Sequence, residues 1–249
     1  MKKIRLDQIL AGRELAADPK EAAAFVMAGL VFSGERRLEK PGELVTEDLP
    51  LSVRGKEHPY VGRGGLKLAA ALAHWKLDVR GLRCLDLGSS TGGFTDCLLQ
   101  AGAASVTAVD SGTNQLDWKL RKDPRVRSLE NSSAVGLAPE AIGGPAQFAC
   151  LDLSFMRLEK AFPSLKRLIL PGAFWVALVK PQFELRRDEV PEGGVVKDAA
   201  LQMRALNEVT AGATREGLGP IGSIPSPIHG KDGNIEFLLL GRLEELIQT

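Results

Sequence analysis

The sequence predicts an α/β protein with a mostly parallel sheet covered on both faces, preceded by a small α+β domain. From residue 58 onward, nearly unbroken apolar segments alternate with amphipathic segments long enough for helices. Before that point, two helical patterns are followed by short segments in which apolar and polar residues alternate. The chain has 249 residues, 44% of them hydrophobic, which is enough for one large core and a small second one.

The first domain is expected to span residues 1–57. Apolar residues at helical spacing predict a helix near the N-terminus. Asp18 and Pro19 are typical of a helix start, and Gly29 of a helix end, so a second helix is expected between them. Short alternating segments then predict small strands, up to a linker at about residues 54–63.

The second domain is expected to span residues 58–249 and to alternate strands with helices. Strands are predicted at 83–88, 105–110, 125–130, 146–153, 173–180, 219–224 and 235–241. Helices are predicted at 65–76, 93–101, 114–121, 157–169 and 198–216. Only a turn-rich segment separates the last two strands, which indicates an antiparallel hairpin at the end of the sheet.

A glycine-rich turn follows the first of these strands, in the stretch CLDLGSSTGGFTDCLL at 84–99. A phosphate-binding P-loop would need a lysine in the turn, and none is present. A dinucleotide-binding loop would need a glycine where Ser90 stands. The remaining pattern is an acid followed by two spaced glycines, here Asp86, Gly88 and Gly92, and it suits a ligand with a ribose and an amino acid but no phosphate.

Asp110 ends the next strand, where a carboxylate can accept hydrogen bonds from ribose hydroxyls. Together with the turn it favours S-adenosylmethionine over a mere packing turn with a surface aspartate. The sequence therefore predicts a Rossmann-like sheet of an S-adenosylmethionine-dependent methyltransferase. The residues expected to bind the cofactor are Asp86, Gly88, Ser89, Ser90, Gly92, Gly93, Phe94, Asp110 and Asp152.

Four charged residues suggest the chemistry: Lys67, Asp152, Lys180 and Glu236. Lys180 closes a near-continuous apolar strand, which is costly unless its ammonium reaches a polar cleft. Ligand sites of parallel sheets lie at the carboxyl ends of strands, where Asp152 and Lys180 fall. A lysine that accepts a proton from a ribose hydroxyl, oriented by carboxylates, would suit methylation of that hydroxyl. Two ordinary salt bridges are the alternative.

Six ordered stretches carry a family resemblance: YVGRGGLKL, LDLGSSTGGFTDCLLQ, AVDSGTNQLDWKLR, LDLSF, LVKPQFE and HGKDGNIEFLL. Over essentially its whole length the chain resembles the TlyA (hemolysin A) family, in which an S4-like RNA-binding domain precedes an FtsJ-like ribose 2′-O-methyltransferase domain. The resemblance implies a catalytic tetrad at Lys67, Asp152, Lys180 and Glu236. It also implies S-adenosylmethionine as donor, and cytidine ribose in ribosomal RNA or ribosomal subunits as acceptor.

The first domain carries no excess of positive charge with which to bind RNA. Residues 1–57 hold ten Lys/Arg and ten Asp/Glu, so this domain is expected to bind RNA weakly or with help from the second domain. Phe183 is a candidate to stack on an acceptor base, and a charged loop around 193–194 is expected near the acceptor. The candidate RNA-binding residues are Lys2, Lys3, Arg5, Arg36, Arg37 and Arg63.

Composition limits the remaining possibilities. Three scattered cysteines and three histidines give neither a disulfide framework nor a metal-ligand pattern, so no metal is expected. No secretion signal or membrane span is recognisable, which indicates a cytoplasmic protein without membrane contact. The alternatives are a catalytically inactive RNA- and cofactor-binding protein, a hemolysin and a dinucleotide oxidoreductase. The sequence does not indicate the oligomeric state or the target nucleotide.

Overall fold

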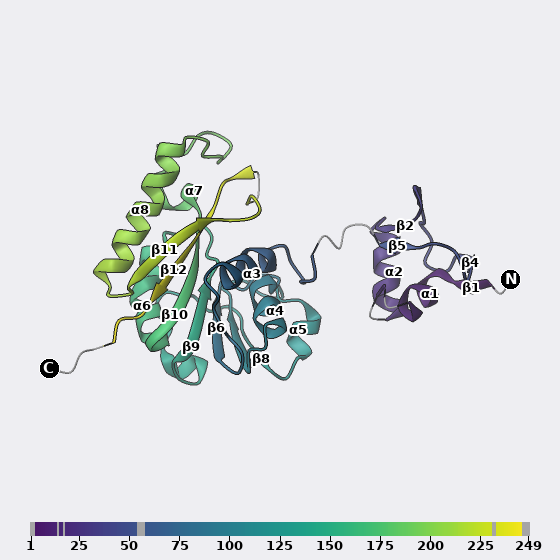
Figure 1. Cartoon of the computed structure of the whole chain (residues 1–249), viewed down its shortest axis with the longest axis horizontal. Helices are drawn as coiled ribbons and strands as arrows, with labels where there is room; N and C mark the ends of the chain where they lie inside the picture. Colours follow the sequence, from purple (N-terminus) through teal and green to yellow (C-terminus); the bar gives the residue numbers. More distant parts are fainter. Residues whose placement is uncertain (1–2, 14, 17, 54–57, 231–232, 246–249) are drawn as a thin grey trace. The chain divides into compact units, whose positions relative to one another are not determined.

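The computed structural model describes residues 3–13, 15–16, 18–53, 58–230 and 233–245. The chain divides into two compact units, Met1–Pro59 and Tyr60–Thr249 (Figure 1). No helix within the described ranges is both long enough and apolar enough to cross a membrane.

The smaller unit packs two helices, α1 (Leu6–Gly12) and α2 (Pro19–Met27), against short strands. The Asp18 carboxylate accepts a 2.8 Å hydrogen bond from the backbone N–H of Glu21 and caps α2, as the sequence predicts. The strands form two antiparallel sheets, β1 (Lys3–Arg5) with β4 (Leu44–Thr46), and β2 (Val31–Ser33) between β3 (Arg36–Arg37) and β5 (Ser52–Val53). β1 was not predicted, because three residues are too few to show an alternating pattern.

The larger unit is built on a seven-stranded sheet in the order β11-β12-β10-β9-β6-β7-β8. Each predicted strand is present, and their bounds are β6 (Arg83–Leu87), β7 (Ser105–Val109), β8 (Val126–Leu129), β9 (Ala146–Leu151), β10 (Ile169–Val179), β11 (Pro220–Pro225) and β12 (Phe237–Arg242). The pairs from β10 to β8 are parallel, whereas β12 runs antiparallel to both β10 and β11. The predicted terminal hairpin is therefore confirmed.

Helices cover both faces of this sheet (Figure 1). One hydrophobic cluster joins the strands to α3 (Gly64–His74), α4 (Gly93–Gln100) and α5 (Trp118–Lys122). A second cluster joins the opposite face to α6 (Phe162–Leu168) and α8 (Ala199–Arg215), with the short turn η1 (Pro139–Ile142) at its edge. The unbroken apolar strands of the sequence are thus buried from two sides, as expected.

Two helices differ from the prediction. The one expected at 114–121 begins at Trp118, because the Asp117 side chain caps that position by accepting a 2.8 Å hydrogen bond from the N–H of Lys119. The one expected at 157–169 is divided into η2 (Leu158–Ala161) and α6, where Pro163 offers no N–H to continue the preceding turn. A further short helix, α7 (Pro181–Glu184), follows Lys180 directly.

Trp175 of β10 provides a test of the packing between sheet and helices. Its ring is fully buried, lies opposite Gly241 of β12, and donates a 2.8 Å hydrogen bond to the carbonyl oxygen of Leu218. A Cβ added at Gly241 would lie 2.2 Å from the Trp175 ring. We expect Gly241→Ala to lower the free energy of unfolding by about 1–3 kcal/mol, measured by urea denaturation. Gly222→Ala on β11 is the matched control, since its Cβ would meet nothing within 4 Å.

Candidate active site

A cavity of about 750 Å³ lies at the carboxyl ends of the parallel strands. Segments that follow three strands line it: the glycine-rich turn after β6, Asp152 after β9 and Lys180 after β10. Lys67 of α3 and Glu236, which directly precedes β12, complete its charged wall. The structure thus brings the four residues of the predicted tetrad to one cavity.

The tetrad forms two ion pairs. Lys180 Nζ lies 2.5 Å from Asp152 Oδ1 and donates a 2.9 Å hydrogen bond to Ser154 Oγ. Lys67 Nζ lies 2.5 Å from Glu236 Oε2. Both lysines and Glu236 are buried, with at most 8% of each residue exposed. Charges taken out of water at this depth need a partner, and each lysine has one carboxylate.

The glycine-rich turn is shaped by contacts within the chain. Gly88 has φ of +85°, and a Cβ there would lie 2.5 Å from the carbonyl oxygen of Asp152. Gly92 has φ of +99°, and a Cβ there would lie 2.2 Å from the Leu120 side chain. Both glycines therefore satisfy packing requirements of the protein itself. The turn residues that line the cavity are Gly88, Ser89, Ser90, Thr91, Gly93 and Phe94; Gly92 is not among them.

Asp110 lines a smaller cavity of about 290 Å³ that shares Gly88, Ser90 and Phe155 with the larger one. Its carboxylate accepts hydrogen bonds from the backbone N–H groups of Ser90, at 2.8 Å, and Gly112, at 2.7 Å. These bonds fix the carboxylate and leave lone pairs of both oxygens for further donors. The smaller cavity can hold a nucleoside with its ribose at Asp110, and the larger cavity can hold the rest of the cofactor. The residues present therefore fit S-adenosylmethionine.

Asp86 departs from its expected place at the cofactor. Its side chain is fully buried, lines neither cavity, and accepts a 2.6 Å hydrogen bond from the Thr95 hydroxyl. Burial, with a smaller contribution from the charge of Asp152, raises the pKa of Asp86 to about 7. Asp86 therefore stabilises the start of α4 through Thr95. The sequence pattern alone could not show that its carboxylate lies on the side of the turn that faces away from both cavities.

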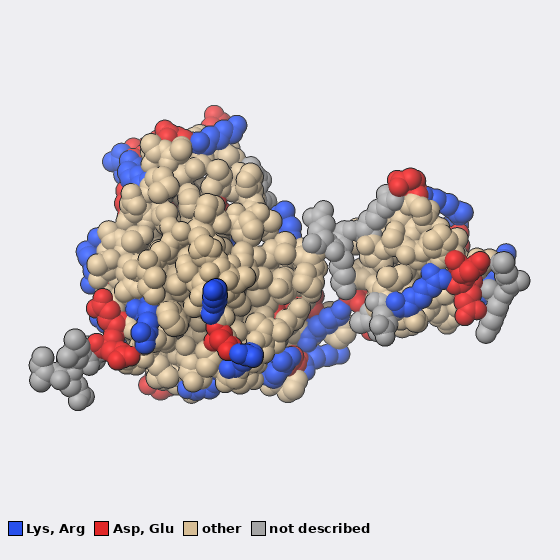
Figure 2. Space-filling view, in the orientation of Figure 1, with Lys and Arg blue, Asp and Glu red and all other residues tan. Residues whose placement is uncertain are grey.

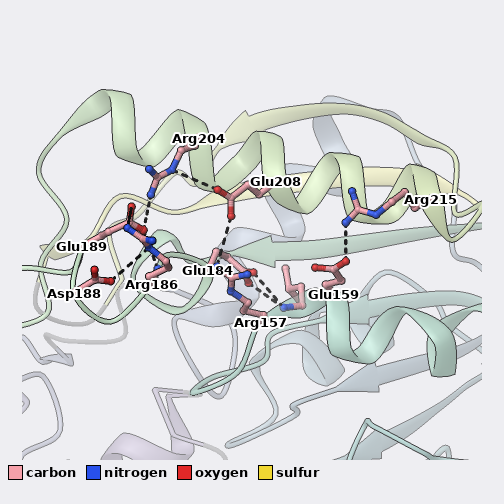
Figure 3. Close-up of polar contacts among 10 residues, drawn as sticks. Arg157, Glu159, Glu184, Arg186, Asp188, Glu189, Arg204, Glu208 and Arg215 are labelled. Atoms are coloured by element: carbon pink, nitrogen blue, oxygen red, sulfur yellow. Dashed lines mark hydrogen bonds and ion pairs between the residues drawn. The ribbon is translucent and has the colours of Figure 1, made fainter.

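Glu184 is a second buried carboxylate, at the end of α7. It accepts hydrogen bonds of 3.1 and 3.3 Å from the backbone N–H of Leu158 (Figure 3). Burial raises the pKa of Glu184 to about 7. Since Leu158 follows Asp152 in the chain and Glu184 follows Lys180, this contact holds together the two segments that carry the Lys180–Asp152 ion pair.

Two aromatic residues stand at the cavity. Phe155 has φ of +62° and is 90% exposed, which is unusual for an aromatic side chain on both counts. Its ring centroid lies 5.2 Å from that of Phe183, whose own ring lies 5.8 Å from Lys180 Nζ. Phe183 was singled out from the sequence, whereas Phe155 was not, because no pattern of residues signals a left-handed backbone at a phenylalanine.

The loop expected near the acceptor does line the cavity, through Val190, Gly193 and Gly194. Asn234 holds it there and was not predicted. The Asn234 side chain donates a 3.0 Å hydrogen bond to the carbonyl oxygen of Gly194 and accepts one of 3.0 Å from the N–H of Val196. Only the folded chain brings residues this far apart in the sequence together.

The candidate RNA-binding arginines of the smaller unit are each paired with an acid. Arg5 lies 2.5 Å from Asp7, Arg36 lies 3.1 Å from Glu43, and Arg37 lies 2.6 Å from Glu39. Figure 2 shows basic and acidic side chains side by side on this unit. Lys3 is exposed, Lys2 lies outside the described residues, and Arg63 of the larger unit lines the cavity. The described part of the chain holds no cluster of acids, histidines or cysteines suited to a metal ion.

Comparison with known proteins supports this description. The family model for FtsJ-like methyltransferases matches residues 60–243. The chain is 46% identical to YqxC of Bacillus subtilis, whose name designates a candidate rRNA methyltransferase, over 96% of this chain and 85% of that protein. It is 42% identical to the 16S/23S rRNA (cytidine-2′-O)-methyltransferase TlyA of Mycobacterium tuberculosis, over 96% of this chain and 89% of that protein.

A solved structure extends the likeness to three dimensions. It is that of a candidate hemolysin from Streptococcus thermophilus, which is 42% identical and superposes with a TM-score of 0.76. The match covers 98% of this chain and 90% of that one, so both units of the chain have counterparts in it.

The two buried carboxylates predict a pH dependence of stability. With native pKa values of about 7, Asp86 and Glu184 hold protons that the unfolded chain releases above about pH 4. Their contribution to stability is complete below that pH and is lost as the pH rises through about 7. We expect the free energy of unfolding to fall between about pH 5 and pH 7, by up to about 1.4 kcal/mol per pH unit for each group.

Urea denaturation across this pH range measures the effect. Asp86→Asn and Glu184→Gln should each flatten the curve, because neither amide titrates. Asp78→Asn is the control, since the pKa of Asp78 is lowered to about 2 by Arg80 and Asp78 stays ionised throughout. A wild-type curve that is flat over this range would contradict the assignment.

Proposed function

The chain belongs to the FtsJ-like methyltransferase family, and we propose that it transfers a methyl group from S-adenosylmethionine to the 2′-hydroxyl of a cytidine in ribosomal RNA. The observation that carries the proposal is the pair of buried lysine–carboxylate contacts, Lys180 with Asp152 and Lys67 with Glu236, facing the cavity that the glycine-rich turn also lines. This activity would place the protein in the cytoplasm.

The cofactor would be held by the turn and by Asp110. The Asp110 carboxylate, fixed by two backbone N–H groups, accepts hydrogen bonds from the ribose hydroxyls. Ser89, Ser90, Gly93 and Phe94 line the wall along which the rest of the molecule lies. When bound, S-adenosylmethionine supplies a methyl group activated by its positively charged sulfur.

The tetrad provides the acid–base chemistry. A ribose hydroxyl is a weak nucleophile and must lose its proton as it attacks. Lys180 in its neutral form accepts that proton at Nζ, and the Asp152 carboxylate at 2.5 Å then stabilises the ammonium that results. Lys67 and Glu236 hold the acceptor ribose by donating to and accepting from its hydroxyl groups. Ser154 keeps the Lys180 side chain directed into the cavity.

The smaller unit serves in this proposal as an S4-like RNA-binding domain. Because Arg5, Arg36 and Arg37 already face carboxylates, each phosphate that binds them must compete with an acid. Lys3 and the cavity residue Arg63 would then contribute more per residue to binding RNA phosphates. The acceptor base would stack on Phe155, which projects from the cavity wall into solvent.

Lys180→Arg tests the proton transfer. Arginine keeps the positive charge beside Asp152 but does not lose its proton, so we expect methyl transfer to fall by about 10²–10⁴-fold. The Kd for S-adenosylmethionine should change by less than about threefold, which is below 1 kcal/mol. The assay follows tritium from S-adenosylmethionine into ribosomal RNA of a strain lacking the enzyme, and locates it by the alkali resistance of the methylated ribose.

The matched control is Lys166→Arg on α6, which lies outside both cavities and should keep full activity. Full activity of Lys180→Arg would exclude its role as the base. If the wild-type protein binds the donor and methylates neither naked RNA nor ribosomal subunits, the chain is instead a binding protein without this activity.

Phe155→Gly separates stability from activity. Glycine adopts φ of +62° without strain, and the 90% exposed ring contributes little buried surface, so we expect the free energy of unfolding to stay the same or rise by up to about 1 kcal/mol. Methyl transfer should fall by about tenfold or more, since base stacking contributes about 1–3 kcal/mol. Loss of stability together with unchanged transfer would show that Phe155 serves only the fold.

A further inference from the structure

A third cavity, of about 730 Å³, opens beside the one that the tetrad lines, and we call it the basic groove. The two cavities share Phe155, Gln182, Phe183 and Val190, so they adjoin each other. Of the described residues, no carboxylate side chain lines the basic groove, whereas three cationic ones do: Arg157, Lys160 and Arg187.

Two of these cations have no acidic partner within the described part of the chain. Arg157 lies 3.6 Å from Glu208 (Figure 3). Lys160 and Arg187 are exposed, and neither has an ion-pair partner among the residues that the structure describes. The neighbouring Arg186 behaves differently, because it pairs with Asp188 and Glu189 (Figure 3). The basic groove is therefore a local positive site on a chain whose formal net charge is only +1.

The position of the basic groove limits what can occupy it. Phe155 lines both the groove and the catalytic cavity, so the occupant lies next to whatever binds at Lys180 and Asp152. An RNA strand whose acceptor nucleotide enters the catalytic cavity must continue past Phe155. Its next phosphates require cations, and its unstacked bases require apolar surface such as Phe183 and Leu185.

Resting on the proposed function, we propose that the basic groove binds the nucleotides that flank the acceptor cytidine, as single-stranded RNA. Lys160 and Arg187 bind their phosphates, and the ring of Phe183 lies against a flanking base. A duplex would keep its bases stacked and present none of them to these side chains. The groove would thereby select acceptors that lie in loops, bulges or opened helices.

The first experiment removes the two unpaired charges in Lys160→Ala/Arg187→Ala. Its control, Lys166→Ala/Arg167→Ala, removes as many exposed charges from α6 outside the basic groove. For methylation of ribosomal RNA we expect the KM of the groove variant to rise about tenfold, with kcat within about twofold. The slope of log KM against log salt should fall by about 1.4, the value for two phosphate contacts on a single strand. The control should match the wild type.

A cross-link identifies the occupant directly. Arg187→Cys places an exposed thiol in the basic groove, while the three native cysteines are buried, so a photoreactive group can be attached there selectively. We expect cross-links to ribosomal RNA at a nucleotide adjacent to, or next but one from, the methylated cytidine. Cross-links to a ribosomal protein, or to RNA remote from that cytidine, would overturn the proposal.

The kinetic experiment distinguishes the proposed role of the basic groove from the proposed methyl transfer. A groove variant with the KM and salt slope of its control, on a substrate that the wild type methylates, overturns the role of the basic groove and leaves the proposed function intact. Wild-type protein that binds S-adenosylmethionine but labels no RNA or subunit overturns the proposed function, and the flanking-nucleotide proposal with it.

Discussion

The buried lysine–carboxylate pairs are the constraint on which the rest of the site depends. Lys67 and Lys180 lie almost out of water, where an unpaired ammonium is strongly unfavourable. Each is matched by a carboxylate from a different part of the chain, Glu236 before β12 and Asp152 after β9. Removing one partner of such a pair costs about 3–5 kcal/mol in proteins generally. The groups proposed to orient the acceptor therefore also fix α3, β9, β10 and β12 at their ends.

The glycine-rich turn lies against Asp152, the carboxylate that pairs with Lys180. Gly88 brings its backbone against the carbonyl oxygen of Asp152, at a distance that no side chain would permit. The N–H of Asp152 in turn donates a 2.9 Å hydrogen bond to the carbonyl oxygen of Leu87. The turn proposed to hold the donor and the carboxylate proposed to serve the acceptor are thus parts of one backbone network. Their separation is set by the fold and does not depend on either ligand.

The sequence predicts those features of the fold and the site that leave a local pattern of residues. Apolar runs located the inner strands β6, β9, β10 and β12 of the large sheet. The rule that ligands bind at the carboxyl ends of strands placed Asp110, Asp152 and Lys180 at one edge of the sheet, where the structure has them. Features that the sequence analysis missed depend on contacts that follow no periodic pattern of residues. Arg5, a candidate RNA-binding residue, pairs with Asp7 only two residues away, and the sequence alone does not show whether such neighbours form an ion pair. The burial of the Asp86 carboxylate and the left-handed backbone of Phe155 likewise follow no periodic pattern in the sequence.

The distribution of paired and unpaired charge bears on how such a protein selects its substrate. Electrostatic attraction to phosphate is independent of sequence, so a surface rich in free cations would hold any RNA. Here many arginines face acids. Arg63 lines the cavity of the tetrad, Lys160 and Arg187 line the basic groove, and none of these three has an ion-pair partner among the described residues. At these three positions, positive charge is available to a strand already positioned for transfer. Selectivity would come from the opened shape of the acceptor region, because only an unpaired strand can reach these residues together with Phe155.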